Sequence, residues 1–192
     1  MTPDLLSLIP ALVSLQHLIE RFDNQGIIIG GVALSLLARP RFTADVDALL
    51  LVDDDDIPHL IGMAEQEGLV PRIPDALAFA QQQRVLLLQH RDSSINVDIA
   101  LGLLLFEIEA VGRSQVYQIA TLSLRLPTPE DLIIFKAVAH RPKDLLDIQT
   151  MIECYPHLDT QYIAERVREF AQLLEMPKVS DDIAPWLRLA QF

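Results

Sequence analysis

The chain of 192 residues contains a single cysteine, Cys154. One cysteine excludes an internal disulfide framework and a zinc site built from several cysteines. The apolar runs are short and interrupted, and the N-terminus lacks a basic region followed by an apolar stretch. We therefore expect neither a signal peptide nor a membrane span, and we expect a protein of the reducing cytoplasm.

Positive charge is also scarce, because 15 Lys and Arg stand against 27 Asp and Glu and leave a formal net charge of −12. A protein that coats nucleic acid non-specifically is usually basic, so this balance argues against extensive duplex binding. A local basic patch is still compatible with it, and carboxylates gathered around a metal ion would contribute to the total. Apolar residues make up 51% of the chain, so we expect a folded protein and not a disordered one.

The apolar pattern predicts an α/β protein of the α+β type, with a mixed sheet flanked by helices. Apolar residues at steps of three and four predict an amphipathic helix over residues 3–24, with Thr2 as its cap. The run Ile27-Ile28-Ile29 lacks alternation, as expected for a strand buried on both faces. Residues 71–82 favour neither a helix nor a strand. The other predicted elements are helices at 32–38, 57–68 and 103–111, strands at 44–52, 84–90 and 95–101, the last two as a hairpin, and short extended segments at 115–120 and 122–126.

From residue 128 onward the sequence predicts helices only. Thr128-Pro129-Glu130-Asp131 combines a threonine cap, a proline at the first helical position and acids in the first turn. We therefore expect two parts, a mixed domain over residues 1–127 and a helical C-terminal lobe over residues 128–192. The predicted helices of the lobe are 128–140, 142–153, 159–175 and 181–189.

A pair of glycines, Gly30-Gly31, stands between the buried strand and a short predicted helix. Glycine lets backbone N–H groups approach a phosphate closely, and the N-terminus of a helix favours negative charge. This turn is a candidate phosphate site. Glycine pairs also occur at strand–helix turns without any ligand, which is the alternative.

Two aspartates, Asp45 and Asp47, occupy alternate positions of the strand predicted at 44–52. The strand period of two directs both carboxylates to one side, roughly 6–7 Å apart at Cα. Such a pair repels unless a cation neutralises it or one group is protonated, and its oxygen atoms suit Mg²⁺ or Mn²⁺. The pair is a candidate metal site, with a surface loop as the alternative.

A third aspartate, Asp98, lies in the strand-like segment INVDIAL, on the same predicted face as Asn96 and Ala100. If this segment lies beside the first pair, a third carboxylate completes a cluster for two metal ions. Two such ions can bridge an incoming nucleophile and a leaving phosphate. A structural aspartate at a sheet edge is the alternative.

Lys136 lies in an apolar helical stretch, and a buried lysine needs an anionic partner. Alternatively its stem extends to solvent. The charged residues that follow fit a capped, salt-bridged helix start as well as a binding segment, and they are Arg141, Lys143, Asp144 and Asp147. His140 is placed either to cap a helix end or to act as a ligand.

Taken together, the pattern G-G-x-A-(x)7-R-x-T-x-D-x-D, which runs here from Gly30 to Asp47, resembles the nucleotidyltransferase superfamily related to DNA polymerase β. More closely it resembles the bacterial AbiEii-type nucleotidyltransferases, many of them toxins of toxin–antitoxin pairs. The segment FKAVAHRPKDLLDI, residues 135–148, is similar to the second signature of that group. The resemblance covers about residues 25–150, and it implies a nucleotidyltransferase-like mixed sheet with a catalytic domain over residues 1–127.

The resemblance also implies roles for individual residues. Gly30 and Gly31 would cradle the triphosphate of an NTP, and Asp45 and Asp47 would bind Mg²⁺ or Mn²⁺. Asp98 would be the third carboxylate, which activates the acceptor hydroxyl. The remaining nucleotide-binding positions implied by the motifs are Arg41, Thr43, Lys136 and Asp144. Many members of the superfamily have serine after the first glycine, where this chain has Gly31.

The leading expectation is thus a metal-dependent enzyme that transfers an NMP from an NTP to a hydroxyl and releases pyrophosphate. By resemblance, its acceptor could be the 3′ end of tRNA and its partner a cognate antitoxin. One alternative is an enzyme of the aminoglycoside type with a small-molecule acceptor, which the acidic composition favours. A second alternative is a protein that binds nucleotide without catalysis.

Overall fold

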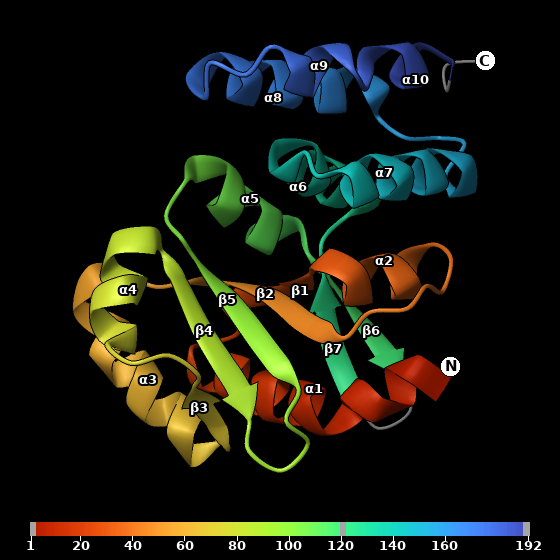
Figure 1. Ribbon diagram of the computed structural model, residues 1–192. Helices are drawn as coiled ribbons and strands as arrows, with labels where there is room; N and C mark the ends of the chain where they lie inside the picture. Colours follow the sequence, from red (N-terminus) through yellow and green to blue (C-terminus); the bar gives the residue numbers. More distant parts are fainter. Residues whose placement is uncertain (1–2, 120–121, 190–192) are drawn as a thin grey trace. The chain divides into compact units, whose positions relative to one another are not determined.

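The computed structural model describes residues 3–119 and 122–189 (Figure 1). The chain divides into two compact units, Met1–Ala33 with Arg41–Pro127, and Leu34–Pro40 with Thr128–Phe192. The predicted cap Thr2 lies outside the described residues. No helix within the described ranges is long and apolar enough to cross a membrane.

The first unit is built on a five-stranded sheet with the order β1-β2-β5-β4-β3. Only β2 and β5 pair in parallel, while the other neighbours in this sheet are antiparallel. The sheet is therefore mixed, and the predicted fold class is confirmed. Its strands are β1 (Gly26–Ile29), β2 (Asp45–Leu51), β3 (Leu69–Pro71), β4 (Val85–His90) and β5 (Asn96–Gly102).

Alternation of buried and exposed residues builds one side of the core. In β4 and β5, every second side chain is buried, including Leu86, Leu88, Val97 and Ile99. The predicted hairpin of these two strands is confirmed by their antiparallel register. In β1, consecutive buried isoleucines fill both faces of the strand, as the absence of alternation indicated.

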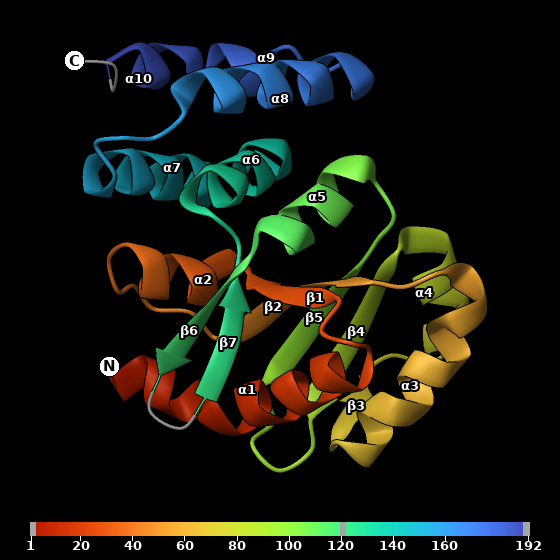
Figure 2. The same ribbon diagram turned by 180° about the vertical axis from the view of Figure 1, so that it is seen from behind.

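Helices cover the sheet and supply the rest of this core. The longest helix, α1 (Pro3–Arg21), lies along one face of the sheet, as Figure 2 shows from behind. Its leucines at steps of three, four and seven are buried, including Leu8, Leu15 and Leu18. The other elements of this unit are η1 (Asp54–Asp56), α3 (Ile57–Gln66), α4 (Ala76–Gln83), α5 (Leu105–Arg113) and the hairpin of β6 (Gln115–Ile119) and β7 (Leu122–Leu126). Helix α2 (Gly30–Leu37) starts in this unit and ends in the second.

Residues 71–82, which the sequence left unassigned, contain the end of β3 and most of α4. Two residues with positive φ, Asp75 and Arg84, flank α4. A short strand that ends at a proline and an eight-residue helix offer little periodicity, so tertiary pairing with β4 decides this segment.

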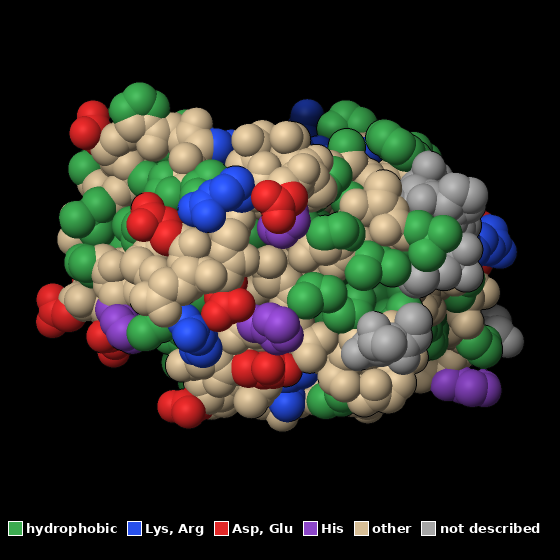
Figure 3. Space-filling model, turned by 90° about the horizontal axis from the view of Figure 1, so that it is seen from below, with side chains coloured by type: hydrophobic (Ala, Val, Ile, Leu, Met, Phe, Trp, Pro, Cys, Tyr) green, Lys and Arg blue, Asp and Glu red, His purple; other side chains and the backbone are tan. Residues whose placement is uncertain are grey.

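Acidic and basic side chains lie near one another on the surface of the first unit. On the face shown in Figure 3, Lys and Arg side chains are scattered among acidic ones. Arg21 of α1, for example, lies 3.2 Å from Glu67 through its Nε atom. Exposed pairs of this kind contribute little to stability, typically about 0–1 kcal/mol.

The second unit is helical, and each predicted helix except the last is a single helix in the structure. Residues 181–189, predicted as one short helix, contain the end of α9 (Lys178–Asp181) and all of α10 (Ala184–Leu189). Buried residues of α6 such as Leu132, Ile133 and Ile134 contribute to its core. The other helices are α6 (Pro129–Ala139), α7 (Pro142–Cys154) and α8 (Thr160–Leu173).

The predicted cap at the start of α6 is confirmed. The Thr128 Oγ1 atom accepts a hydrogen bond from the backbone N–H of Asp131 at 3.1 Å, which satisfies one of the free N–H groups of the first turn.

Removing this cap should weaken the second unit. We expect Thr128→Ala to lower its free energy of unfolding by about 1 kcal/mol, because the Asp131 N–H loses its acceptor. Thr128→Ser keeps the hydroxyl and should stay close to the wild type. Urea unfolding followed by the fluorescence of Trp186, the single tryptophan and a residue of this unit, measures the difference. Equal destabilisation by alanine and serine would contradict the assigned role.

Candidate active site

The three predicted aspartates lie on neighbouring strands of the first unit. The parallel pairing of β2 and β5 places Asp47 directly opposite Asp98 in register, and Asp45 opposite Asn96. Because side chains alternate along a strand, Asp45 and Asp47 point to the same face, and Asp98 is their neighbour on that face. All three are partly exposed, and Asp47 and Asp98 each lie between two buried apolar neighbours. The predicted proximity of Asp98 to the pair is present in the structure.

Gly30 begins α2 with a left-handed backbone, φ +65°. A Cβ atom at this position would lie 2.0 Å from the Asp47 Oδ2 atom. The absence of a side chain therefore leaves room for the carboxylate against the start of the helix. Both properties of glycine are needed here, the positive φ and the missing Cβ.

Gly31 makes room for the loop that leads into β2. A Cβ atom there would meet the Thr43 Oγ1 atom at 2.6 Å and the Arg41 Nη2 atom at 3.3 Å. The close packing of this loop against the glycine turn explains why the glycine pair and the R-x-T-x-D-x-D segment form one structural element.

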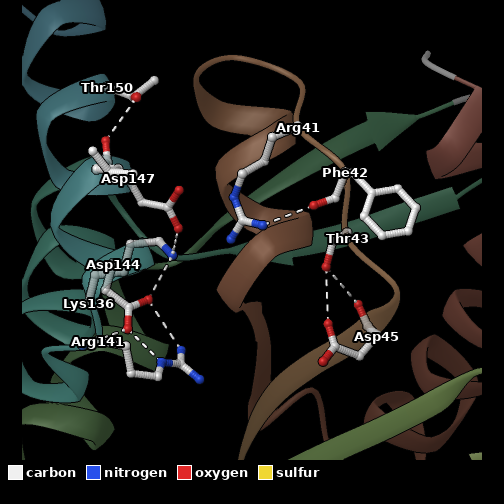
Figure 4. Close-up of polar contacts among 10 residues, drawn as sticks. Arg41, Phe42, Thr43, Asp45, Lys136, Arg141, Asp144, Asp147 and Thr150 are labelled. Carbon is white, nitrogen blue, oxygen red and sulfur yellow. Dashed lines mark hydrogen bonds and ion pairs between the residues drawn. The ribbon is translucent and has the colours of Figure 1, made fainter.

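Side-chain hydrogen bonds order this loop, which Figure 4 shows beside Asp45. The Thr43 hydroxyl donates to the Asp45 Oδ1 atom, with 3.1 Å between the two oxygens. The Arg41 Nη1 atom donates to the backbone oxygen of Phe42 at 3.0 Å. Thr43 is buried, whereas the Phe42 ring is 69% exposed. In this structure Thr43 orients a carboxylate of the predicted metal site.

Arg72, which the sequence did not single out, contacts the third carboxylate. Its Nη1 atom lies 2.7 Å from the Asp98 Oδ1 atom, and its Nη2 atom donates to Oδ2 at 3.1 Å. Arg72 directly follows β3, so its position depends on the order β5-β4-β3. The sequence carried no signal for this contact because β3 itself was not predicted.

The donor atoms of Asp45, Asp47 and Asp98 are those of a site for a hard divalent ion. Three carboxylates on one sheet face supply oxygen atoms only, which suits Mg²⁺ or Mn²⁺. Within residues 3–119 and 122–189, however, no group of three or more His, Cys, Asp or Glu side chains is arranged to hold a metal ion. The carboxylates thus fit such an ion by chemistry and by strand position, but in this arrangement they do not converge on one point, and Asp98 is paired with Arg72.

The second unit holds the other predicted site residues, Lys136 and Asp144. Together with Asp147 they form a buried charged cluster, which the exposed Arg141 contacts through Asp144. The Lys136 Nζ atom donates to the Asp147 Oδ2 atom at 2.6 Å and lies 3.6 Å from the Asp144 Oδ1 atom (Figure 4). Lys136 is only 3% exposed. The anionic partner that a buried lysine requires is thus Asp147. The role of Lys136 in nucleotide binding, which the motifs imply, stays a prediction.

Asp144 is buried at the start of α7, in the third helical position. Its Oδ2 atom accepts hydrogen bonds from the backbone N and the Nε atom of Arg141, at 3.2 and 2.6 Å. Burial by itself raises the pKa of Asp144, but the hydrogen bonds and charge of Arg141 and the charge of Lys136 outweigh it and hold the pKa below its ordinary value. Asp144 is therefore an ionised member of a salt-bridged helix start, one of the two interpretations that the sequence left open.

His140 ends α6 with a positive φ of 50°, as a helix-capping residue does. Its Nε2 atom lies 3.2 Å from the Asp182 Oδ2 atom. Of the two roles considered from the sequence, the structure supports the capping one.

A side chain at Gly30 should disturb both the backbone and the acidic pair. We expect Gly30→Ala to lower the stability of the first unit by at least roughly 1–2 kcal/mol, the cost of a left-handed backbone for alanine, and to displace the Asp47 carboxylate. Gly62→Ala is a matched control, because Gly62 lies in α3 and a Cβ there meets nothing within 4 Å. We expect Gly62→Ala to raise the free energy of unfolding by roughly 0.4–1 kcal/mol. Urea unfolding followed by circular dichroism checks both, and an unchanged Gly30→Ala protein would refute the assigned crowding.

The stability of the second unit should depend on pH through Asp144. Because its pKa is lowered on folding, Asp144 stabilises the fold above its unfolded pKa of about 3.9, and this contribution is lost as pH falls through the folded pKa. We expect Asp144→Asn to cost roughly 1–3 kcal/mol at pH 7 and progressively less below about pH 4. Trp186 fluorescence in urea at several pH values measures the difference. Asp181→Asn, at an exposed carboxylate of the same unit, should show no such pH trend.

The fold of this chain is similar to those of two solved structures. One is an antigenic nucleotidyltransferase-like protein from Paracoccidioides brasiliensis, at 17% identity and a TM-score of 0.55, over 93% of this chain and 91% of that one. The other is a candidate nucleotidyltransferase from H. pylori, at 15% identity and a TM-score of 0.53, over 99% of this chain and 96% of that one. At these identities the likeness concerns the fold alone. None of the curated proteins matches this chain.

A family model adds a match at the level of sequence. It covers residues 5–182, a range that contains the glycine pair, the three aspartates and the buried cluster of the second unit. The nucleotidyltransferase superfamily that the motifs indicated is thereby supported. The chain belongs to the family described as nucleotidyltransferase of unknown function (DUF6036).

Proposed function

We propose that this protein transfers an NMP from an NTP to a hydroxyl acceptor and depends on Mg²⁺ or Mn²⁺. The observation that carries the proposal is the register of β2 and β5, which places Asp47 beside Asp98 with Asp45 on the same face. Membership of a nucleotidyltransferase family supports the reaction type. Divalent ions bound by these carboxylates would neutralise the developing charge on the phosphates.

The residues of the first unit have separable roles in this reaction. Asp45 and Asp47 would hold the ion, with Thr43 fixing the Asp45 carboxylate through its hydrogen bond. Gly30 and Gly31 would let the backbone at the start of α2 approach the triphosphate. The acceptor oxygen forms a bond to the α-phosphorus, the bond to the bridging oxygen breaks, and pyrophosphate leaves with that electron pair. Asp98 would be the third carboxylate ligand of the ion and would accept the hydroxyl proton.

For the acceptor, we propose the 3′ end of tRNA, as in an AbiEii-like toxin with a cognate antitoxin. The motif from Gly30 to Asp47 and the segment at residues 135–148 support this assignment. In the second unit, Lys136 and Asp144 would then contribute to nucleotide binding. Their buried pairing requires that any such contribution act through the arrangement of the cluster or through its opening.

A small-molecule acceptor is the second candidate. It is favoured by the net charge of −12, because a cationic acceptor such as an aminoglycoside is attracted to an acidic protein. The two acceptors share one reaction, so they differ only in which molecule receives the label in the experiment below.

The test is transfer of label from NTPs that carry ³²P at the α-phosphate. We expect the protein with Mg²⁺ to label tRNA in total RNA, with pyrophosphate as the second product. Asp47→Asn should reduce the rate by more than about a hundredfold, since it removes a proposed ligand and not merely a partner of one. Asp92→Asn, an exposed aspartate in the β4–β5 turn, is the matched control and should keep full activity.

The outcomes separate the candidates. Label on an aminoglycoside and none on RNA would favour the small-molecule acceptor. Mg²⁺-dependent NTP binding by calorimetry without any turnover would favour a non-catalytic nucleotide-binding protein. Equal labelling by wild type and Asp47→Asn would remove the aspartates from the mechanism.

A further inference from the structure

Arg72 and Asp98 form an ion pair in which each group relies on the other. The Arg72 Nη1 and Asp98 Oδ1 atoms are shielded from solvent and form an ion pair at 2.7 Å, and neither atom has a hydrogen-bond partner among the described residues. The second contact, from Nη2 to Oδ2 at 3.1 Å, completes a fork-like arrangement. A carboxylate with a shielded oxygen needs a cation beside it, and in this structure that cation is Arg72.

The position of the Arg72–Asp98 pair at the protein surface nevertheless permits the two side chains to separate. The backbone N–H of Arg72 is held by the backbone oxygen of Leu87 at 3.1 Å, which fixes the start of the side chain. The side chain itself is 25% exposed and that of Asp98 is 29% exposed, so both reach solvent at one edge. A long, flexible stem lets the guanidinium move away while the backbone stays in place.

Arg72 contacts both carboxylate oxygens of Asp98, so these oxygens are not freely available to coordinate a metal ion. A divalent ion that enters beside Asp47 must therefore either share the carboxylate or replace the guanidinium. As long as the pair is closed, the positive charge of Arg72 beside Asp98 also repels an incoming cation. Both effects act in the same direction, against binding of the ion.

We propose that Arg72 competes with the divalent ion for Asp98, so that loading of the site requires the Arg72–Asp98 pair to open. This inference rests on the proposed function, since it takes Asp98 as a ligand. It gives Arg72 a role opposite to that of an orienting residue. A group that merely orients Asp98 would strengthen ion binding, whereas a competitor weakens it.

The test is the affinity for Mn²⁺ alone, measured by electron paramagnetic resonance of the free ion. We expect Arg72→Gln to bind Mn²⁺ about tenfold more tightly than the wild type, within the range usual for coupling between two binding equilibria. Arg72→Lys retains the charge but loses the fork, and it should bind roughly threefold more tightly. Arg91→Gln, at an exposed arginine of the β4–β5 turn, removes the same net charge and should leave the affinity unchanged.

The variant Asp98→Asn removes the carboxylate for which Arg72 and the ion are proposed to compete. In its background the effect of Arg72→Gln should disappear, because the two residues no longer compete through a shared carboxylate. Urea unfolding without Mn²⁺ checks that each variant is folded, and if Arg72→Gln is not, Arg72→Lys carries the test.

Each result decides a separate point. Unchanged or weaker Mn²⁺ binding by the Arg72 variants, with clear binding by the wild type, overturns the competition and leaves the proposed function standing. Absence of Mn²⁺ binding in the wild type and in every variant overturns the competition, whereas the metal dependence of the reaction is decided separately by the labelling experiment, because substrate phosphates also bind such ions. Tighter binding that persists in the Asp98→Asn background assigns the effect to charge alone and also overturns the proposal.

Discussion

The parallel register of β2 and β5 is the constraint on which the rest of the candidate site depends. Buried Val46 and Ala48 alternate with the aspartates of β2, and Val97 and Ile99 do the same in β5. A slip of one residue would turn the aspartates into the core and the apolar side chains out of it, which burial forbids. The apolar face of the sheet therefore fixes the relative position of carboxylates that are distant in sequence.

The glycine pair meets a steric requirement before any requirement of a ligand. Gly30 accommodates the Asp47 carboxylate, and Gly31 accommodates Thr43 and Arg41. Their presence would be explained without a phosphate, and the roles are compatible, because backbone that lets a side chain approach also lets a phosphate approach. The same absence of Cβ atoms thus links the helix start to the acidic strand.

In the second unit the charged residues are buried and paired with one another. Lys136 on α6 meets Asp144 and Asp147, which lie three residues apart on one side of α7. Buried ion pairs contribute little net stability, but loss of one partner leaves a charge without compensation. The pair of helices α6 and α7 is therefore held in one arrangement by a network that tolerates little change. In the first unit, Arg72 and Asp98 form a more exposed pair with fewer contacts.

The sequence by itself determined the elements that periodicity and local chemistry encode. These are the apolar face of helix α1, the isoleucine strand β1, the β4–β5 hairpin, the cap at Thr128 and the orientation of Asp45 and Asp47 toward one face of the sheet. It indicated Asp98 as a neighbour of that pair only through resemblance and strand pattern. Tertiary structure alone decided β3 and α4, the burial of Lys136 against Asp147, and the contact of Arg72 with Asp98. The physical reason is that the energies of these contacts come from partners far along the chain, which local sequence does not record.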